Sequence, residues 1–477
     1  MKAFQNTVDG RQIGSARTFE SKNPATGEPI GVVPHSDPEQ VAQALSAAKA
    51  AQPAWAALPD SKRQELLGKV ADALKENASY LAEWVTREQG KPLGGLGPDQ
   101  VPGALFELAG CEAWTRVPAS LELPVETVFE DDARKYEMHR KPYGVIAAIA
   151  PWNWPLLIAI WQIVPALRAG NTVVIKPSEF TSIGTLEMVR IMAQQLPPGV
   201  LNTVSGPGDV GAALVDNPLV DKIMFTGSAV TGAKISAIAA RHLTPTTMEL
   251  GGNDAAIVLA DADPKGIAMG LFWGAFINMG QTCAAIKRLY VPEALHDAVV
   301  SELKAIATTV PMGNGMDNGV VMGPIQNRAQ FDKVSRLVDE ARTAGGTVVC
   351  GGAQSGGAGH FYPLTLVTEI KDGASLVDEE QFGPALPIIR YNKLDDAVNN
   401  ANRLDVGLGA SVWGTDIEAA KAVATRLQAG TVWINQHGAI HPMVPFGGVK
   451  GSGWGVEFGQ EGLKAVTQPQ VVSIPKQ

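Results

Sequence analysis

The sequence is poor in cysteine and in positive charge. It has 3 cysteines among 477 residues, Cys111, Cys283 and Cys350, and 39 lysines and arginines against 48 aspartates and glutamates. So few cysteines cannot form a disulfide framework, which favours a reducing compartment. A net charge of −9 with no dense basic patch excludes the electrostatic footprint of a nucleic-acid binder. We therefore expect a cytoplasmic protein with no nucleic-acid partner.

The sequence also lacks a long uninterrupted apolar run. Residues 144–164 are mostly apolar, but two prolines, Asn153 and Gln162 interrupt them before the length that a bilayer requires. The first residues, 1–7, contain no apolar segment of the kind found in signal peptides. We therefore expect no membrane partner and interpret residues 144–164 as a buried strand, a turn and a buried helix.

What the sequence does contain is glycine, with 51 residues, in a chain that is 45% apolar and 18% charged. This composition is typical of a compact, loop-rich globular enzyme, and the length predicts two or three domains. Residues 38–124 follow a largely helical pattern. Residues 121–142 are extended and charged, which predicts a projecting hairpin, and the extended tail at 466–475 is expected to pair with it.

From residue 143 the pattern alternates between short apolar strands and helices. Strands are predicted at 144–150, 172–176, 201–204 and 222–225, and helices at 156–169, 182–195 and 229–241. After Glu249 a second series begins, with a strand at 255–259 and a long helix at 264–279 whose end delivers Cys283 into a loop. Such alternation predicts an α/β fold: a Rossmann-like parallel-sheet domain for a nucleotide, followed by a second α/β domain.

Two residues in the second half of the chain carry the chemistry of acyl transfer. Cys283 lies in a run of small and polar residues at 278–285, and Glu249 begins the run Glu249–Asn253. A thiolate attacks a carbonyl carbon and a carboxylate deprotonates a water, so a reaction that forms a thioester and then hydrolyses it needs both. The alternative is that Cys283 is only a small buried apolar residue.

Three further segments follow predicted strands, at the edge where doubly wound sheets bind ligands. At 225–232, glycines at the start of a predicted helix would let a pyrophosphate bind closely. The alternative is a plain tight turn with a serine cap. At 176–179 a lysine and a glutamate suit ribose hydroxyls, or form a solvated charge pair. In the stiff turn at 151–155, the Asn153 amide could donate a hydrogen bond to a developing oxyanion. The alternative is that it bonds only to the backbone of its own turn.

Taken together, these segments resemble the NAD(P)-dependent aldehyde dehydrogenase superfamily, of the hydrolytic, non-acylating type. The motifs that carry the resemblance, in the order of the family, are Pro151–Pro155, Lys176–Glu179, Phe225–Ser228, Glu249–Asn253, Gly280–Ala285, Glu379–Pro384 and Pro445–Gly448. The resemblance itself spans nearly the whole chain. The 34 positions that separate Glu249 from Cys283 also resemble the spacing of hydrolytic members.

The resemblance implies a role for each motif. Cys283 would be the nucleophile, Glu249 the general base, and Asn153 with the Cys283 backbone N–H the oxyanion hole. The residues implied to bind the NAD cofactor are Trp152, Lys176, Ser178, Glu179, Gly227, Ser228, Gly232, Leu250, Glu380 and Phe382. The implied domains are 1–120 with 143–250 for the cofactor, 251–450 for catalysis, and 121–142 with 460–477 for oligomerisation as a homodimer or homotetramer.

By the same analogy the substrate aldehyde would meet a mostly apolar pocket. The residues expected there are Trp154, Ile158, Trp161, Thr282, His441 and Met443. The first three lie close to one helical face, although simple core packing of the two tryptophans is the alternative. Since no Lys or Arg in these segments could hold a second carboxylate, we expect an uncharged aliphatic or aromatic aldehyde.

The choice of cofactor follows from charge. Glu179 favours NAD, because a carboxylate accepts a hydrogen bond from the ribose 2′-OH and repels a 2′-phosphate. Lys176 nearby would tolerate that phosphate, which leaves use of NADP open.

Two alternative functions and two departures from the family remain. A succinic-semialdehyde-like dehydrogenase and a CoA-acylating one are the alternatives, and Glu249 disfavours the second because that route needs no water-activating base. Asn253–Asp254 stands where relatives often carry Lys-Ser, and Val456–Phe458 where many carry Arg-Glu. We expect neither change to touch a catalytic position. His437 and His441 lie four apart in an expected loop, so we predict no metal site.

Overall fold

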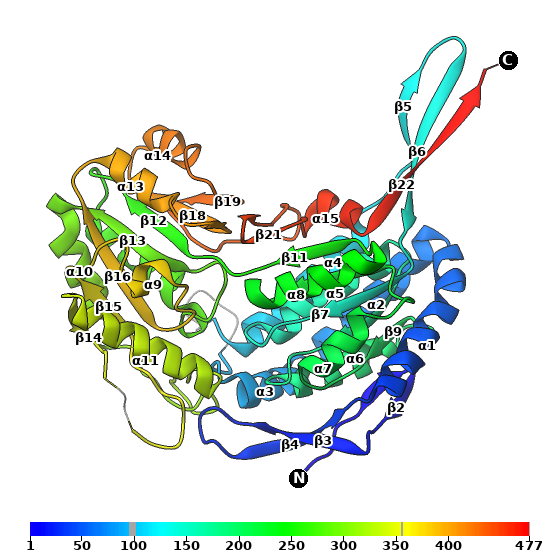
Figure 1. The fold of residues 1–477 in the computed structure, drawn as a ribbon, viewed down its shortest axis with the longest axis horizontal. Helices are drawn as coiled ribbons and strands as arrows, with labels where there is room; N and C mark the ends of the chain where they lie inside the picture. The colour runs from blue at the N-terminus through cyan, green and yellow to red at the C-terminus, as the bar shows by residue number, and fades with distance from the viewer. Residues whose placement is uncertain (95–101, 354–355, 477) are drawn as a thin grey trace.

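The computed structural model describes residues 1–94, 102–353 and 356–476. It has two α/β lobes, each built around its own sheet, and a three-stranded ribbon that projects from the first lobe (Figure 1). This arrangement confirms the predicted α/β fold.

The first lobe contains a six-stranded sheet with the order β21-β11-β10-β7-β8-β9. Its strands are β7 (Val145–Ile149), β8 (Thr172–Lys176), β9 (Leu201–Thr203), β10 (Lys222–Thr226), β11 (Thr246–Glu249) and β21 (Gly453–Trp454). Strands β7 to β11 are parallel, as predicted, and β21 adds an antiparallel edge. The sequence pattern predicts no strand at β21, because two residues carry no periodicity and only pairing with β11 defines them.

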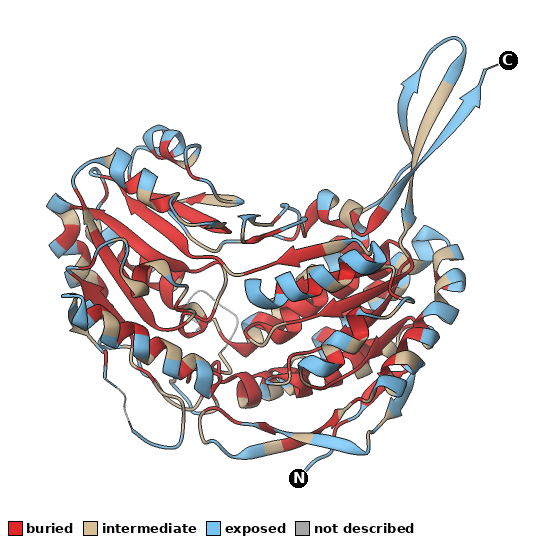
Figure 2. Ribbon diagram, in the orientation of Figure 1, coloured by how far each residue is buried: buried red, intermediate tan, exposed pale blue. Residues whose placement is uncertain are grey.

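Helices cover both faces of this sheet. They are α1 (Pro38–Ala57), α2 (Asp60–Glu76), α3 (Ala78–Gln89), α4 (Ala104–Ser120), α5 (Pro155–Arg168), α6 (Ser182–Ala193), α7 (Gly208–Val215) and α8 (Ala229–His242). Ile146 and Ile175 pack toward α2 to α6, whereas Val145 and Ala147 pack toward α1, α7 and α8. Burial on both faces explains why these strands are continuously apolar (Figure 2).

The strand order of the first sheet reverses between β7 and β10. In open parallel sheets the crevice outside the carboxyl ends of the strands at such a reversal is the usual ligand site. Residues 151–153 follow β7, and residues 227–228 follow β10. The fold therefore brings together two motifs that lie far apart in the sequence.

The second lobe contains a seven-stranded sheet with the order β14-β15-β16-β13-β12-β18-β19, in which only β14 is antiparallel among the described pairs. Its strands are β12 (Asp254–Val258), β13 (Ile286–Pro292), β14 (Thr347–Cys350), β15 (Thr365–Thr368), β16 (Ala385–Tyr391), β18 (Gly409–Trp413) and β19 (Thr431–Ile434). Its helices are α9 (Pro264–Phe276), α10 (Glu293–Ala307), α11 (Arg328–Thr343), α12 (Ser375–Asp378), α13 (Leu394–Ala401) and α14 (Ile417–Ala424).

The projecting ribbon consists of β5 (Glu126–Glu130), β6 (Arg134–Pro142) and β22 (Thr467–Pro475), in the order β22-β6-β5. It confirms both the hairpin and its pairing with the tail. The segment 460–477 does not belong to the ribbon throughout, however. Its first residues form α15 (Gly459–Ala465), which packs against α5 in the body of the first lobe.

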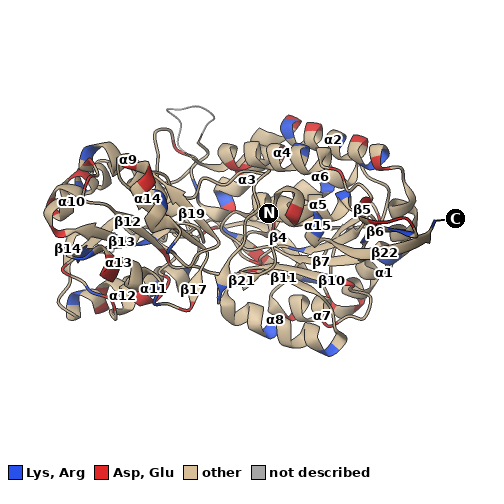
Figure 3. Cartoon of the chain, turned by 90° about the horizontal axis from the view of Figure 1, so that it is seen from above, with Lys and Arg blue, Asp and Glu red and all other residues tan. Residues whose placement is uncertain are grey.

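Short elements complete the chain, namely β1 (Asn6–Val8), β2 (Arg11–Ile13), β3 (Arg17–Lys22), β4 (Pro29–His35), β17 (Val406–Gly407) and β20 (Val449–Lys450). Acidic and basic residues alternate along the outer helices (Figure 3). Among the described residues, no helix combines the length and apolar character needed to cross a bilayer.

Candidate active site

Two cavities meet at Cys283. One has a volume of about 180 Å³ and is lined by residues that follow β7, β10 and β11 together with residues of the second lobe. The other, of about 610 Å³, is lined mainly by apolar side chains of both lobes. Ile158 and Cys283 line both cavities. A group bound in either cavity can therefore reach the thiol.

A tight turn carries Cys283 out of α9. The predicted helix to residue 279 is wrong, because α9 ends at Phe276 and a 3₁₀ turn follows in which Asn278 and Met279 have φ of 51° and 60°. Gly280 continues the left-handed path with φ of 68°, and a Cβ there would overlap the carbonyl oxygen of Gly383. Left-handed backbone at non-glycine residues is strained and tends to occur at functional sites.

Burial and nearby carboxylates hold the Cys283 thiol in its neutral form. They raise its pKa to about 12, with burial as the largest cause, followed by the charges of Glu380 and Asp254. The backbone N–H of Ala284, which hydrogen-bonds the sulfur, acts in the opposite direction. A positive charge in the adjoining cavity would favour the thiolate.

Asn153 lies in the turn between β7 and α5, bonded to the loop of the nucleophile. Its side-chain Nδ2 donates to the carbonyl of Gln281 at 3.0 Å, and its own carbonyl accepts from Asn278 Nδ2 at 2.9 Å. The next residue repeats the link, since Trp154 Nε1 donates to Thr282 Oγ1 at 3.0 Å. The two segments that were predicted to form the oxyanion hole are thus held side by side.

Glu249 ends β11 as a buried carboxyl group that lines the smaller cavity. Within the described part of the chain, neither of its oxygens has a hydrogen-bond partner. Burial, and then the charge of Glu457, raise the pKa of Glu249 well above its ordinary value. Burial also raises the pKa of Glu457 to about 8.

The expectation that Val456–Phe458 touches no catalytic position is therefore wrong. The charge of Glu457 acts on the predicted base Glu249, and Phe458 packs against Trp161 with a centroid distance of 4.7 Å. Sequence spacing offered no signal for these contacts, because some 200 residues separate β11 from this segment and β21 brings it back.

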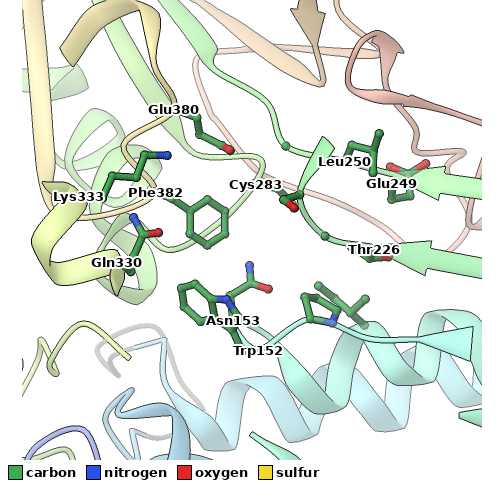
Figure 4. A pocket seen from close by; sticks show the side chains of 15 residues that line it. Trp152, Asn153, Thr226, Glu249, Leu250, Cys283, Gln330, Lys333, Glu380 and Phe382 are labelled. Atoms are coloured by element: carbon green, nitrogen blue, oxygen red, sulfur yellow. The ribbon is translucent and has the colours of Figure 1, made fainter. Parts of the chain in front are cut away.

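The smaller cavity collects most of the residues predicted to bind the cofactor. Of the predicted cofactor residues, those that line it are Trp152, Gly227, Ser228, Leu250, Glu380 and Phe382 (Figure 4). The predicted catalytic residues Asn153, Glu249 and Cys283 also line it. The remaining lining residues are Pro151, Ile158, Thr226, Gly251, Gln330 and Lys333. The aromatic rings of Trp152 and Phe382 meet edge to face at 5.4 Å. Glu380 accepts from the backbone N–H of Gly252 at 3.1 Å, and a Cβ at Gly251 would overlap its carboxylate. Burial raises the pKa of Glu380 to about 7.

This cavity has the features that a dinucleotide needs. The N-terminus of α8 opens on it, with Ser228 as the cap, so free N–H groups and the helix dipole favour an anion. Gly232, one turn further, packs so closely on Leu250 that a Cβ would come within 2.6 Å of its side chain. The glycine therefore sets the approach of α8 to the sheet.

The residues predicted for the ribose lie just outside the lining of this cavity. Lys176 is buried at the end of β8, with its Nζ 3.9 Å from Glu179 Oε2, so the alternative of a fully solvated pair does not hold for the lysine. Burial lowers the pKa of Lys176. Ser178 Oγ accepts from the backbone N–H of Phe180 at 3.3 Å and shapes the turn between them.

The larger cavity is apolar and rich in tryptophan. It is lined by Phe106, Trp114, Trp154, Leu157, Ile158, Trp161, Trp273, Ile277, Thr282, Ala284, His437, Ile440 and Phe446, among others. No Lys, Arg, Asp or Glu lines it in the described parts of the chain. Trp154 and Trp161 are buried, yet both face the cavity, so core packing is not their whole environment.

The expected contribution of His441 and Met443 to this pocket is wrong. Both side chains are exposed, and neither lines either cavity. The chain turns away at this point, because the Met443 N–H donates to His441 Nδ1 at 3.2 Å. The loop instead reaches the cavity through Gly438 to Ile440.

The structure explains the Asn253–Asp254 departure. Asn253 Nδ2 donates to the carbonyl of Val377 at 2.9 Å, and Asp254 accepts from the Gly409 N–H at 3.0 Å. Asp254 also lies 3.3 Å from His437, with both side chains fully buried. The pair therefore fastens the start of β12 to helix α12 and to the start of β18.

Several lining residues were not predicted from the sequence. Gln330 and Lys333 line the smaller cavity from α11, and Trp114, Trp273 and Phe446 line the larger one. The spacing of Gln330 and Lys333 by three on a helix was the only local signal, and it says nothing about which cavity they face.

The site thus combines two α/β lobes with a cysteine at the junction of two cavities. The sequence profile of the aldehyde dehydrogenase family matches residues 12–472. A phenylacetaldehyde dehydrogenase of Pseudomonas fluorescens is 37% identical over 98% of this chain and 95% of its own.

Solved structures agree with this match. An NAD⁺ complex of an aldehyde dehydrogenase from Bacillus cereus superposes with a TM-score of 0.95 at 32% identity, covering 100% of this chain and 97% of its own. Lactaldehyde dehydrogenase from Escherichia coli gives a TM-score of 0.94 at 32% identity, with 99% of each chain covered. The chain belongs to the aldehyde dehydrogenase family of oxidoreductases, as the resemblance predicted.

Proposed function

We propose that the protein oxidises an uncharged apolar aldehyde to its carboxylic acid, with NAD as the oxidant. The observation that carries this proposal is the position of Cys283, the thiol at which the smaller cavity, open to the N-terminus of α8, meets the larger apolar cavity. In this scheme the first lobe binds the cofactor, and the second lobe supplies the nucleophile.

In the first step, the Cys283 thiol loses its proton to solvent water. The sulfur then bonds to the aldehyde carbon, the C=O π bond breaks, and the carbonyl oxygen becomes an alkoxide. The Asn153 amide and the Cys283 backbone N–H donate hydrogen bonds to that oxygen, a contribution of roughly 3–4 kcal/mol per donor in comparable sites. The alkoxide then re-forms its C=O bond while the C–H bond of the same carbon breaks, which leaves a thioester on Cys283; NAD, when bound, would supply the electrophilic ring that accepts this hydride. Burial has raised the pKa of the Cys283 thiol to about 12. The positive charge of that ring would lower this pKa and so favour the thiolate.

In the second step, Glu249 activates water against the acyl group that remains on Cys283 as a thioester. The carboxylate takes a proton from the water, whose oxygen bonds to the acyl carbon while the C–S bond breaks. Both Glu249 oxygens lack hydrogen-bond partners among the described residues, so they are free to bind that water.

The apolar cavity supports the proposed substrate class. Its volume of about 610 Å³ and its tryptophan-rich lining suit an aromatic or long aliphatic aldehyde. The absence of a charged side chain from its described lining disfavours a semialdehyde, whose carboxylate would be left buried and unpaired. The relative from Pseudomonas fluorescens, named for phenylacetaldehyde, is in keeping with an aromatic substrate.

We also propose that the ribbon of β5, β6 and β22 joins copies of the chain as a homodimer or homotetramer. Its edge strands carry exposed apolar side chains, among them Phe129 and Val471 at 54% and 62% exposure. Free strand edges of this kind favour pairing with another chain.

The test is to assay the purified protein with NAD against benzaldehyde, hexanal and succinic semialdehyde, with and without CoA, and to identify the product. We expect the free acid without CoA and the lowest kcat/KM for succinic semialdehyde. Cys283→Ala should reduce the rate by more than about 10³-fold. Cys350→Ala, at the other half-buried cysteine, should leave it unchanged. Full activity of Cys283→Ala, a strict need for CoA, or preference for the semialdehyde would overturn the proposal.

A further inference from the structure

A charged pair that the proposed mechanism does not use lies inside the first lobe. Lys91 Nζ is 2.6 Å from Glu107 Oε2, and both side chains are fully buried. Burial lowers the pKa of Lys91. Such a pair is a weak source of stability, because removing two charges from water costs about as much as their attraction returns. A pair of this kind therefore calls for a role other than stability.

The contacts of Lys91 lead to the oxyanion-hole turn. Its Nζ donates a second hydrogen bond, at 2.9 Å, to the backbone carbonyl of Asn153. The same ammonium lies 3.6 Å from the ring centroid of Trp154, a cation–π distance. Lys91 thus holds the two residues that bond to the nucleophile loop.

The contacts of Glu107 hold the other end of the same turn. Its Oε1 accepts from the backbone N–H groups of Leu156 and Leu157 at 2.9 and 3.1 Å. Helix α5 begins at Pro155, and Trp154 provides no side-chain cap. Glu107 therefore supplies the cap from another helix, and its charge complements the positive end of the α5 dipole.

The backbone of Lys91 is itself fixed. Its N–H donates to Gln89 Oε1 at 2.9 Å, and Leu93 donates to the carbonyl of Gly315 at 2.9 Å. A Cβ at Gly315 would come within 2.6 Å of the Lys91 carbonyl oxygen, so the two segments are in close contact. Because the Lys91 backbone is fixed, its side chain can hold Asn153 and Trp154 in place instead of moving with them.

We propose that Lys91 and Glu107 are positioning residues for the Asn153 amide, and that they set the rate at which Cys283 adds to the aldehyde. This inference rests on the proposed function, in which Asn153 stabilises the alkoxide. Together the two side chains hold the main chain from Asn153 to Leu157. A displacement of about 1 Å at such a site can cost on the order of 100-fold in rate.

The test compares Lys91→Met, Glu107→Gln and the double variant in the full-length protein. Lys91→Met leaves a buried carboxylate unpaired and is expected to lower the melting temperature. The double variant carries neither charge of the buried pair. The amide oxygen of its glutamine can still accept hydrogen bonds from the α5 N–H groups, so we expect this variant to fold. Both variants that lack Lys91 should lose about 100-fold in kcat/KM for the aldehyde. The KM for NAD should change by less than about two-fold, because neither residue lines the cofactor cavity.

A matched control uses a second buried carboxyl group of the same lobe. Glu88 accepts from the N–H groups of Ile183 and Gly184 at the start of α6, at 2.8 and 2.7 Å, and none of its hydrogen bonds goes to the turn at Asn153. Glu88→Gln should leave kcat/KM unchanged. Hydrolysis of p-nitrophenyl acetate gives a second readout, because it needs the thiol and the oxyanion hole but no cofactor, and it should fall with Lys91→Met as well.

A double-mutant cycle separates positioning from general structure. In an Asn153→Ala background, Lys91→Met should cost less than about two-fold further, because the group that it positions is already gone. An equal loss in both backgrounds, or no loss in the folded double variant, would overturn the inference. Either result would leave the proposed function intact, since that is tested separately by Cys283→Ala.

Discussion

At the scale of single residues, the site depends on carboxyl groups that burial keeps from ionising. Glu249 can act as a base only when it is deprotonated, yet burial and the charge of Glu457 both raise its pKa. Two carboxyl groups in one buried site cannot both ionise easily, so they titrate as a pair. The rate of thioester hydrolysis should therefore rise with pH through the raised pKa of Glu249.

Replacing Glu457 by Gln tests this coupling. Removing the neighbouring charge lowers the pKa of Glu249, so the rising limb of kcat against pH should move to lower pH. The measurement is kcat for the best aldehyde from about pH 5 to pH 9. Glu461→Gln, an exposed residue of α15 that pairs with Lys464, is the control and should not move the profile. An unmoved profile in Glu457→Gln would show that the charge of Glu457 does not govern hydrolysis.

At the scale of elements, the loops after parallel strands carry most of the site. Residues at and just after the ends of β7, β10 and β11 line the smaller cavity. Lys176 ends β8, and Glu179 follows it. These loops converge because parallel strands end at the same edge of the sheet. The strands supply the buried apolar core of the sheet, whereas the loops after them supply the polar residues of the site.

The loop after β8 should decide between the two dinucleotides. The Glu179 carboxylate is partly exposed, 3.9 Å from Lys176, and repels a 2′-phosphate. In Glu179→Gln the KM for NADP should fall by about ten-fold, since the repulsion is lost and the lysine remains. The KM for NAD should rise slightly. Glu20→Gln, at an exposed glutamate of β3, should change neither KM, and an unaltered NADP/NAD ratio in Glu179→Gln would contradict the assignment.

At the scale of the whole molecule, the lobes and the ribbon have separate tasks. Neither lobe contains a complete site, because Asn153 and Glu249 come from the first and Cys283 and Glu380 from the second. The ribbon is mostly exposed and projects from the first lobe (Figures 1 and 2), and none of its residues is among those that line the two cavities. Its length and its free edges agree with a role in assembly.

Charges on the ribbon should separate the subunits. Val471→Asp with Ile474→Asp places two carboxylates among the exposed apolar residues of β22, and burying them at an interface would be unfavourable. Light scattering after size exclusion should give a dimer or tetramer for the natural sequence and a smaller species for this variant. Ile417→Asp, at an exposed position on α14, should keep the natural assembly. A natural sequence that is monomeric would contradict the role of the ribbon.

The sequence by itself determined the fold class, most element positions and the principal members of the site. Alternation of apolar strands and helices is a local property, and it located β7, β8, β9, β10 and β12 within one or two residues. Asn153, Glu249 and Cys283 were identified from motifs whose residue types already limit the chemistry. Of these, the loop of Cys283 was placed least well, because the left-handed turn at Asn278 and Met279 follows no period.

Only the tertiary structure decided what surrounds those residues. Glu457 reaches Glu249 because β21 returns to the first sheet, and Lys91 and Glu107 reach Asn153 because α3, α4 and α5 pack together. His441 and Met443 lie in the right segment but face away, since a turn of a few residues reverses side-chain direction. The reactions that a side chain can perform depend on its residue type, and the sequence gives the residue type directly. Distance, burial and charge coupling depend on contacts between remote segments, which exist only once the chain has folded.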